Sequence, residues 1–330
     1  MSENKRKQPP GSGPQGQTKK SKRGNDGKWQ TPHQRKMISQ RMDMGGSVES
    51  GDAGIWVTCQ RGLEKKAISE MILLCDELGE TLYDIKAPSK LEENEALDAQ
   101  DDKDIASSIE DEIKRMKKDK TSKADYTFIP VRSGIECVFF MKTRSPVEPV
   151  EFVNRICDDA EKCTDMTERK LRHINRLTPV VLIGKSLDSG IEKVAREVLK
   201  STFALNPENA SEPTTEAEEE ADGAAHSYAI RPNIRASSLK RDEVINRVAA
   251  LVGPKHKVNL TTPDKVILID IYKNLCGMSV VDGPRWDALK KYNVNEIYKQ
   301  ALAKKSERPE TKSDAAAPPA AAQTEVETAG

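Results

Sequence analysis

Nine lysine and arginine side chains lie where the sequence places strand ends, loops or the start of a helix. They are Arg176, Lys185, Arg231, Arg235, Lys240, Arg241, Arg247, Lys255 and Lys257. Cations gathered on one side of a small α/β unit are typical of a surface that binds a phosphate backbone. Lys240 and Arg241 begin a helix, where free backbone N–H groups also favour phosphate. The alternative is a solvated charged surface without a ligand, and the residue types leave both interpretations open.

The rest of the chain lacks the residue patterns of an enzyme. A catalytic site needs a nucleophile beside a base, a paired acid and base, a metal cluster or a loop that holds phosphate. The sequence shows no such set, no GxGxxG after a strand and no Walker motif. The histidines, His33, His173, His226 and His256, stand alone in loop or basic contexts. We therefore expect no catalytic residue and no cofactor.

The cysteines also argue against a metal site. Cys59, Cys75, Cys137, Cys157, Cys163 and Cys276 lie in apolar segments without a CxxC pair. This usage predicts buried free thiols in a reducing compartment. Zinc needs four suitably spaced Cys or His ligands, and neither residue type supplies them.

The elements that must position the cations follow from hydrophobic periodicity. Strands are expected over residues 55–59, 126–131, 135–141, 177–183, 228–234, 257–260, 266–272 and 277–281. Helices are expected from Leu63 through Leu78, after Pro149, after Asp188, over 240–252 and over 286–303. This order predicts an α/β (α+β) protein. A ferredoxin-like domain over residues 52–145 precedes a second domain over 146–284 and a C-terminal helix over 285–305.

Composition predicts that part of the chain lacks a packed core. Hydrophobic residues make up 36% and charged residues 32%, and the charges are segregated although their sum is zero. We expect a disordered basic arm over residues 1–51, charged insertions over 88–122 and 206–225, and a disordered tail over 306–330. No stretch approaches the roughly 20 apolar residues of a membrane span, so we expect no membrane partner.

Two basic clusters in the arm resemble a bipartite nuclear import signal. Lys5, Arg6 and Lys7 form the first, and residues 19–23 form the second after a spacer rich in Pro and Gly. The alternative is an arm that contacts RNA without sequence preference, and both roles are compatible. We expect the protein in the nucleus and, within it, the nucleolus.

Several stretches resemble the THUMP-domain proteins that assist the eukaryotic RNA cytidine acetyltransferase in acetylating tRNA. The strongest is the run KVNLTTPDKVILIDIYKNLCGMSVV over residues 257–281, with an N-x-x-x-P turn, an apolar strand and a closing Ser-Val-Val. Residues 291–293 resemble the family's basic-Tyr-Asn element, 176–180 its Arg-x-x-Pro strand opening and 241–245 its second helix. The opening over 54–62 resembles the family's N-terminal ferredoxin-like domain. The resemblance covers residues 54–299.

The resemblance implies a THUMP RNA-binding domain over residues 146–284. It also implies a non-catalytic adaptor that presents serine and leucine tRNAs to the separate RNA cytidine acetyltransferase, which forms N4-acetylcytidine in the D-arm. Two alternatives stay open: the chain is itself the acetyltransferase or another RNA-modifying enzyme, or it is a protein-binding scaffold that does not contact RNA.

Overall fold

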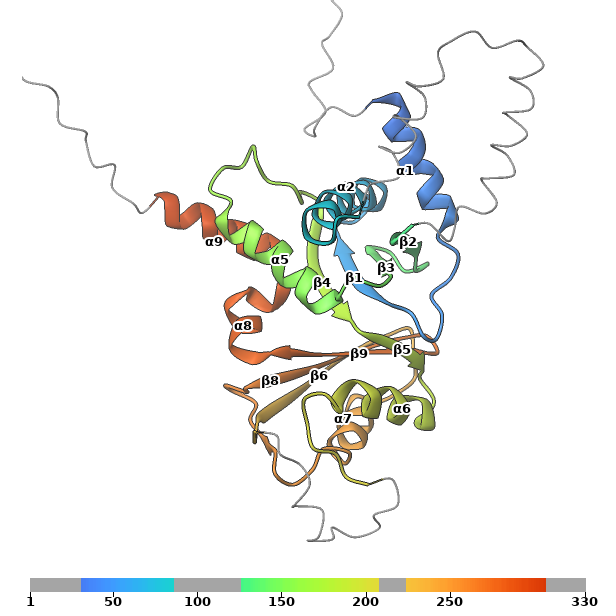
Figure 1. The fold of residues 1–330 in the computed structure, drawn as a ribbon, viewed down its shortest axis with the longest axis vertical. Helices are drawn as coiled ribbons and strands as arrows, with labels where there is room; N and C mark the ends of the chain where they lie inside the picture. Colours follow the sequence, from blue (N-terminus) through green and yellow to red (C-terminus); the bar gives the residue numbers. More distant parts are fainter. Residues whose placement is uncertain (1–30, 86–125, 208–223, 307–330) are drawn as a thin grey trace, which may run out of the picture.

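The computed structural model describes residues 31–85, 126–207 and 224–306, and two β-sheets form its centre (Figure 1). The expectation of a mixed α/β fold is confirmed. The first sheet has the strand order β2-β3-β1-β4, and all neighbouring strands are antiparallel. Its elements are β1 (Ala53–Cys59), α2 (Glu64–Tyr83), β2 (Phe128–Arg132), β3 (Val138–Thr143), α5 (Pro149–Lys162) and β4 (Ile174–Val180). The β-α-β-β-α-β order and this sheet order are those of a ferredoxin-like unit.

Strand β1 is buried on both faces, and each face serves a different core. Ile55 and Val57 point to one side, where α2 and α5 cover the sheet with residues such as Ile68 and Phe152. Trp56 points to the other side, where its ring lies 5.0 Å from that of Tyr272 in the second sheet. Because successive strand residues face opposite sides, this continuous apolar run buries both faces.

The second sheet has the order β5-β9-β8-β6-β7. Its elements are β5 (Leu182–Lys185), α6 (Asp188–Leu199), β6 (Ser227–Arg235), α7 (Arg241–Ala249), β7 (Lys257–Val258), β8 (Lys265–Tyr272) and β9 (Leu275–Asp282). Strand β6 runs parallel to β7 and β8, whereas β9 is antiparallel to β5 and β8. Helices α6 and α7 cover one face (Figure 1). The other face turns toward the first unit.

The chain passes between the sheets through a single residue. Strand β4 ends at Val180 and β5 begins at Leu182, while the N–H of Val181 donates to the carbonyl of Met278 at 3.0 Å. The buried Ser279 hydroxyl donates to the carbonyl of Pro179 at 2.7 Å. At Gly277 an added Cβ would lie 2.8 Å from a methyl of Val180. Only glycine therefore permits the close packing of β4 on β9.

The end of the described chain returns to the first unit. Helix α8 (Gly283–Ala288) and the turn η3 (Lys290–Tyr292) lead into α9 (Val294–Ser306). Val294, Ile297 and Tyr298 are buried in the same core as α2 and α5, and α9 lies beside α5 in Figure 1.

These arrangements correct three expected boundaries. The first unit does not end at residue 145. Strand β4 adds the fourth strand of its sheet, through Val180, and α5 covers one face of that sheet. The single strand expected over residues 177–183 is two strands in different sheets, and the single helix expected over 286–303 is interrupted by η3. Periodicity identifies an element but not its partner, so the sequence could not show that these elements belong to the first unit.

The expectation that residues 1–51 lack a packed core is wrong for α1 (Pro32–Met44). The Thr31 hydroxyl accepts from the Gln34 N–H, and the Gln34 side chain accepts from the Thr31 N–H, which is a capping box. Two guanidinium nitrogens of Arg41, which is 5% exposed, donate to the carboxylate of Asp76 at 2.8 Å each. Low mean hydropathy concealed these helix signals.

Several expectations fall outside the described residues. They are the two basic clusters of the arm, almost all of the two charged insertions and the tail after residue 306. Within the ranges that the structure does describe, none of the helices combines the length and apolarity needed to cross a bilayer.

Candidate nucleic-acid interface

A basin of about 690 Å³ opens between β4 and the face of the second sheet that α6 and α7 leave uncovered. Four cations line it: Arg176 from β4, Arg231 and Arg235 from β6, and Lys291 from η3. Both units therefore contribute positive charge to one concave surface.

Alternation along β6 explains how its arginines reach the basin. Tyr228 and Ile230 pack under α6 and α7, so the intervening residues face the other side. Arg231, Asn233 and Arg235 lie on that side and line the basin. Strand β7 pairs only with Ser227 and Tyr228 of β6, so the rest of β6 is an edge on that side. Pro232 lacks an N–H, but at this edge no neighbouring strand needs a hydrogen bond from it.

Arg235 is held by a buried acid on the neighbouring strand. Its guanidinium donates to Asp270 Oδ1 at 2.7 Å, and the amide of Asn233 donates to the same oxygen at 3.0 Å. Asp270 is 3% exposed. Burial raises the pKa of Asp270 to about 6 and outweighs the opposing attraction of Arg235. The carboxylate therefore fixes Arg235 and offsets part of its charge.

Arg176 and Arg231 differ in how much of their charge stays available. Arg231 donates to the carbonyl of Leu260 at 2.8 Å, which holds the loop after β7. Arg176 is exposed, and across the ranges that the structure describes its side chain makes no hydrogen bond or ion pair. Arg176 is thus the arginine of the basin best able to bind a phosphate.

The turn η3 brings Lys291 to the basin in a strained backbone conformation. Lys290, Lys291 and Tyr292 have φ values of 52°, 57° and 58°, in the left-handed region. For residues with a Cβ, this conformation costs about 1–2 kcal/mol each. The turn persists because Tyr292 is 1% exposed and its hydroxyl donates to Asn154 Oδ1 at 2.9 Å. Asn293 then forms a bridge with Arg176.

An aromatic side chain forms part of the same wall. Trp286 is half-buried and lines the basin. The Lys291 ammonium lies over its ring, 5.5 Å from the ring centre. The polar groups of Asn175, Thr178 and Asn293 complete the lining. Cations, an aromatic face and amide groups therefore share one site.

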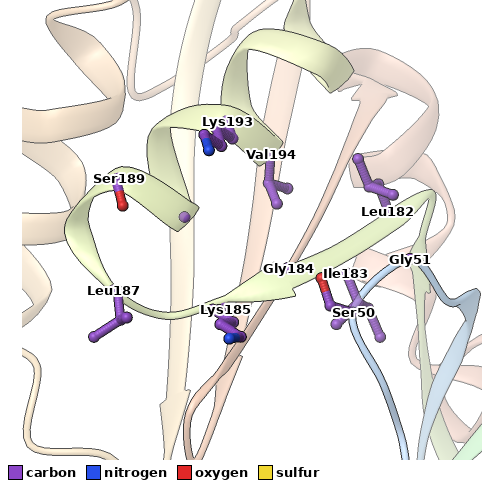
Figure 2. A pocket seen from close by; sticks show the side chains of 11 residues that line it. Ser50, Gly51, Leu182, Ile183, Gly184, Lys185, Leu187, Ser189, Lys193 and Val194 are labelled. Carbon is purple, nitrogen blue, oxygen red and sulfur yellow. The ribbon is translucent and has the colours of Figure 1, made fainter.

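Three further predicted cations lie at the same end of the second sheet but outside the basin. The strand register places Lys185, Leu275, Tyr272 and Arg235 in one row. Lys240 and Arg241 are exposed where α7 begins. Lys185 lines a separate hollow of about 350 Å³ between β5 and the start of α6, together with Leu187 and Lys193 (Figure 2).

Arg247 has a structural position. It forms an ion pair with Asp188 that links α7 to the start of α6, and its side chain is 26% exposed. The hydrogen bond to Asp188 raises the pKa of Arg247, and the same bond lowers the pKa of Asp188. Arg247 therefore supports helix packing.

Lys255 and Lys257 do not join the other cations. Lys257 pairs with Ser227 at the start of β6, whereas Arg235 ends that strand. Eight residues of strand separate the two ends by about 26 Å at 3.3 Å per residue. The sequence suggested that these strand ends meet on one rim, and this is wrong, because the helix between parallel strands returns the chain to the opposite edge.

Sequence reasoning missed Lys291 and Trp286 as site residues. The element over residues 291–293 was recognised as a family resemblance, but its place beside Arg176 depends on η3 folding back on the first unit. A lone tryptophan gives no pattern of surface aromatics. The pairing of Asp270 with Arg235 joins residues 35 positions apart, so no local sequence pattern indicates it.

Comparisons with known proteins agree with this architecture. The family model described as the THUMP domain matches residues 191–281, from the first turn of α6 to the end of β9. An uncharacterized protein of Schizosaccharomyces pombe is 30% identical over 261 residues, which cover 78% of this chain and 80% of that protein. The protein named tRNA acetyltransferase TAN1 of Saccharomyces cerevisiae is 30% identical over 280 residues, 80% of this chain and 90% of that protein. Human THUMP domain-containing protein 1 is 27% identical over 266 residues, 79% and 69% of the two chains.

Proposed function

The chain belongs to the family of THUMP-domain proteins that includes yeast TAN1, and from this premise we propose that it binds tRNA and takes part in tRNA acetylation. The observation that carries the proposal is the basin. Arg176, Arg231, Arg235 and Lys291 converge there from both units, and Lys185, Lys240 and Arg241 extend the positive charge along the same sheet end. Such a surface binds phosphate through counterion release.

More finely, we propose an adaptor. It presents serine and leucine tRNAs to a separate RNA cytidine acetyltransferase, which forms N4-acetylcytidine in the D-arm. The support is the kind of group that the basin offers. Guanidinium, ammonium, amide and aromatic side chains bind and orient RNA, whereas acetyl transfer also needs a group that takes a proton from the amine.

A second candidate function is that the chain acetylates tRNA itself. The name of the yeast relative, tRNA acetyltransferase TAN1, favours it. The basin also holds an acid with a raised pKa, Asp270, and perturbed acids in clefts are candidate general bases. Against this role, Asp270 is 3% exposed and its Oδ1 already accepts from Arg235 and Asn233. A general base must reach the proton that it removes.

Purified components decide between the two. We expect the chain with serine tRNA and acetyl-coenzyme A to yield no acetylcytidine until the acetyltransferase is added, and a leucine tRNA to behave alike. Product in the absence of the second protein would establish the enzyme, and Asp270→Asn would then test its base. Unchanged acetylation by the partner with and without this chain would exclude the adaptor.

The nuclear location is also a proposal, with the nucleolus as the compartment within the nucleus. It rests on the clusters over residues 5–7 and 19–23. Replacing Lys19, Lys20, Lys22 and Arg23 with Ala should move a fluorescent fusion to the cytoplasm and leave tRNA affinity unchanged. Lower affinity with an unchanged location would make this arm an RNA contact instead.

A further inference from the structure

The shape of the basin restricts which part of an RNA can enter it. The buried Leu268 lines it, and its other lining residues come from both units. A volume of about 690 Å³ lies within the roughly 300–1,000 Å³ of sites that enclose small ligands. A paired stem presents a convex surface with its bases stacked inside, so it can touch the rim but cannot fill the hollow. An unpaired nucleotide can.

The lining provides for each part of a nucleotide. Trp286 offers a ring face, and proteins stack unpaired bases on such faces. Lys291 lies above that ring, and the exposed Arg176 lines the same basin, so both cations suit the adjoining phosphates. The Thr178 hydroxyl can donate to and accept from a base edge, whereas the amide oxygens of Asn175 and Asn293 already accept from Asn295 and from the Glu296 N–H. Phosphate binding alone would not need the aromatic face.

The strained turn gives an independent reason. Three consecutive residues with a Cβ hold positive φ, and the last is anchored by its bond to Asn154. Strain of this kind concentrates where a side chain must be held for a ligand. Here it fixes Lys291 over Trp286 and sets Asn293 beside Arg176.

We propose that the basin is a subsite for an unpaired nucleotide whose base stacks on Trp286 and whose phosphates contact Arg176 and Lys291. The inference rests on the proposed function, since it names the part of the RNA that the site takes. Lys291 leaves the ring for the phosphate when the base stacks.

The test compares two RNA hairpins with the same stem, one with a short bulge of unpaired nucleotides and one fully paired. Stacking of one base changes affinity roughly 5- to 150-fold, so the wild-type chain should prefer the bulged hairpin within that range. Trp286→Leu keeps apolar bulk against the core but removes the ring, and it should abolish the preference. Trp286→Phe keeps a ring and should retain most of it.

A matched control separates stacking from charge. Lys240→Ala with Arg241→Ala should weaken both hairpins by the same factor and leave the preference intact. In a Trp29→Phe background, which leaves Trp56 and Trp286, the bulged hairpin should quench fluorescence. The quenching should vanish in Trp286→Phe, because Trp56 is 2% exposed.

The results against the inference are distinct from those against the proposed function. Equal wild-type affinity for both hairpins, or a preference that survives Trp286→Leu, would overturn the nucleotide subsite alone. Failure of the wild-type chain to bind either hairpin or tRNA would overturn the proposed function, and the subsite with it.

Discussion

Both ends of strand β6 carry cations, but the two ends use them differently. At the carboxyl end, Arg235 joins Arg176, Arg231 and Lys291 around one basin. At the amino end, Lys255 and Lys257 lie on an open surface beside the buried His256. The difference teaches that convergence of cations on a concave surface, and not their presence at a strand end, distinguishes a candidate site from a solvated face.

Histidine illustrates the structural character of the amino end. The ring nitrogens of His256 lie 3.0 and 3.1 Å from the N–H groups of Ala204 and His226, and its ring meets that of Phe203 edge-on. It thereby ties the loop before β6 to the loop after α7. Asp270 has the corresponding place at the carboxyl end, but it holds an arginine for the basin.

The largest expected contrast is in RNA binding. Arg176→Ala with Lys291→Ala should lower the slope of log affinity against log salt by roughly 1.4 to 1.8, at 0.7–0.9 per phosphate contact. Lys255→Ala with Lys257→Ala should leave the slope unchanged. Filter binding of tRNA over a salt series measures both. Equal slopes in the two double variants would remove the distinction between the ends.

The next contrast is in stability. Asp270→Ala leaves Arg235 without its partner in a site where the arginine side chain is only 19% exposed. Removing one member of such a pair should lower the free energy of unfolding by about 3 kcal/mol, the low end for a buried pair, because Arg235 keeps some exposure. Lys257→Ala, on the exposed amino end, should change it by less than about 0.5 kcal/mol. Urea denaturation followed by circular dichroism measures the free energy of unfolding of both variants. Similar losses in the two would show that Asp270 does not stabilise the carboxyl end.

A smaller effect tests the strained turn. Lys291→Gly should be about 1 kcal/mol more stable than Lys291→Ala, because glycine adopts φ near 57° without a Cβ penalty. Both variants lack the ammonium and should bind tRNA with equal, weakened affinity. If the alanine variant proved as stable as the glycine variant, the left-handed conformation would carry no strain.

The smallest expected effect is a change of local stability with pH, which should have opposite signs at the two ends of β6. Burial lowers the pKa of His256 below 6.5, so its contribution to stability is complete above that pH and is lost as the pH falls. The pKa of Asp270 is raised from 3.8 to about 6, so its contribution is complete below pH 3.8 and is lost as the pH rises through 6. Amide exchange, corrected for intrinsic rates, should show the amino end loosening in mild acid while the carboxyl end tightens. Asp270→Asn should remove only the second response.

Much of the fold follows from sequence periodicity, and much of the site does not. The strands over residues 266–272 and 277–281 were predicted nearly to the residue, because local apolar patterns specify them. Arg231 and Arg235, which line the basin, were among the predicted cations because charged residues stand out along an apolar strand. Trp286 and Lys291 were missed because they reach the basin only when α9 packs on α5. That contact joins segments some 140 residues apart in the chain.

The one-residue passage at Val181 bears on the thermodynamics of any ligand in the basin. Closure of two bodies around a ligand needs several residues that can change φ and ψ. Here the residue that joins β4 to β5 is already hydrogen-bonded to β9, Ser279 ties the preceding strand, and the chain returns to the first unit through α8 and η3. The walls therefore keep their spacing whether or not the basin is filled. Binding then orders the ligand and little of the protein, so a ligand loses little affinity to reorganisation of the chain.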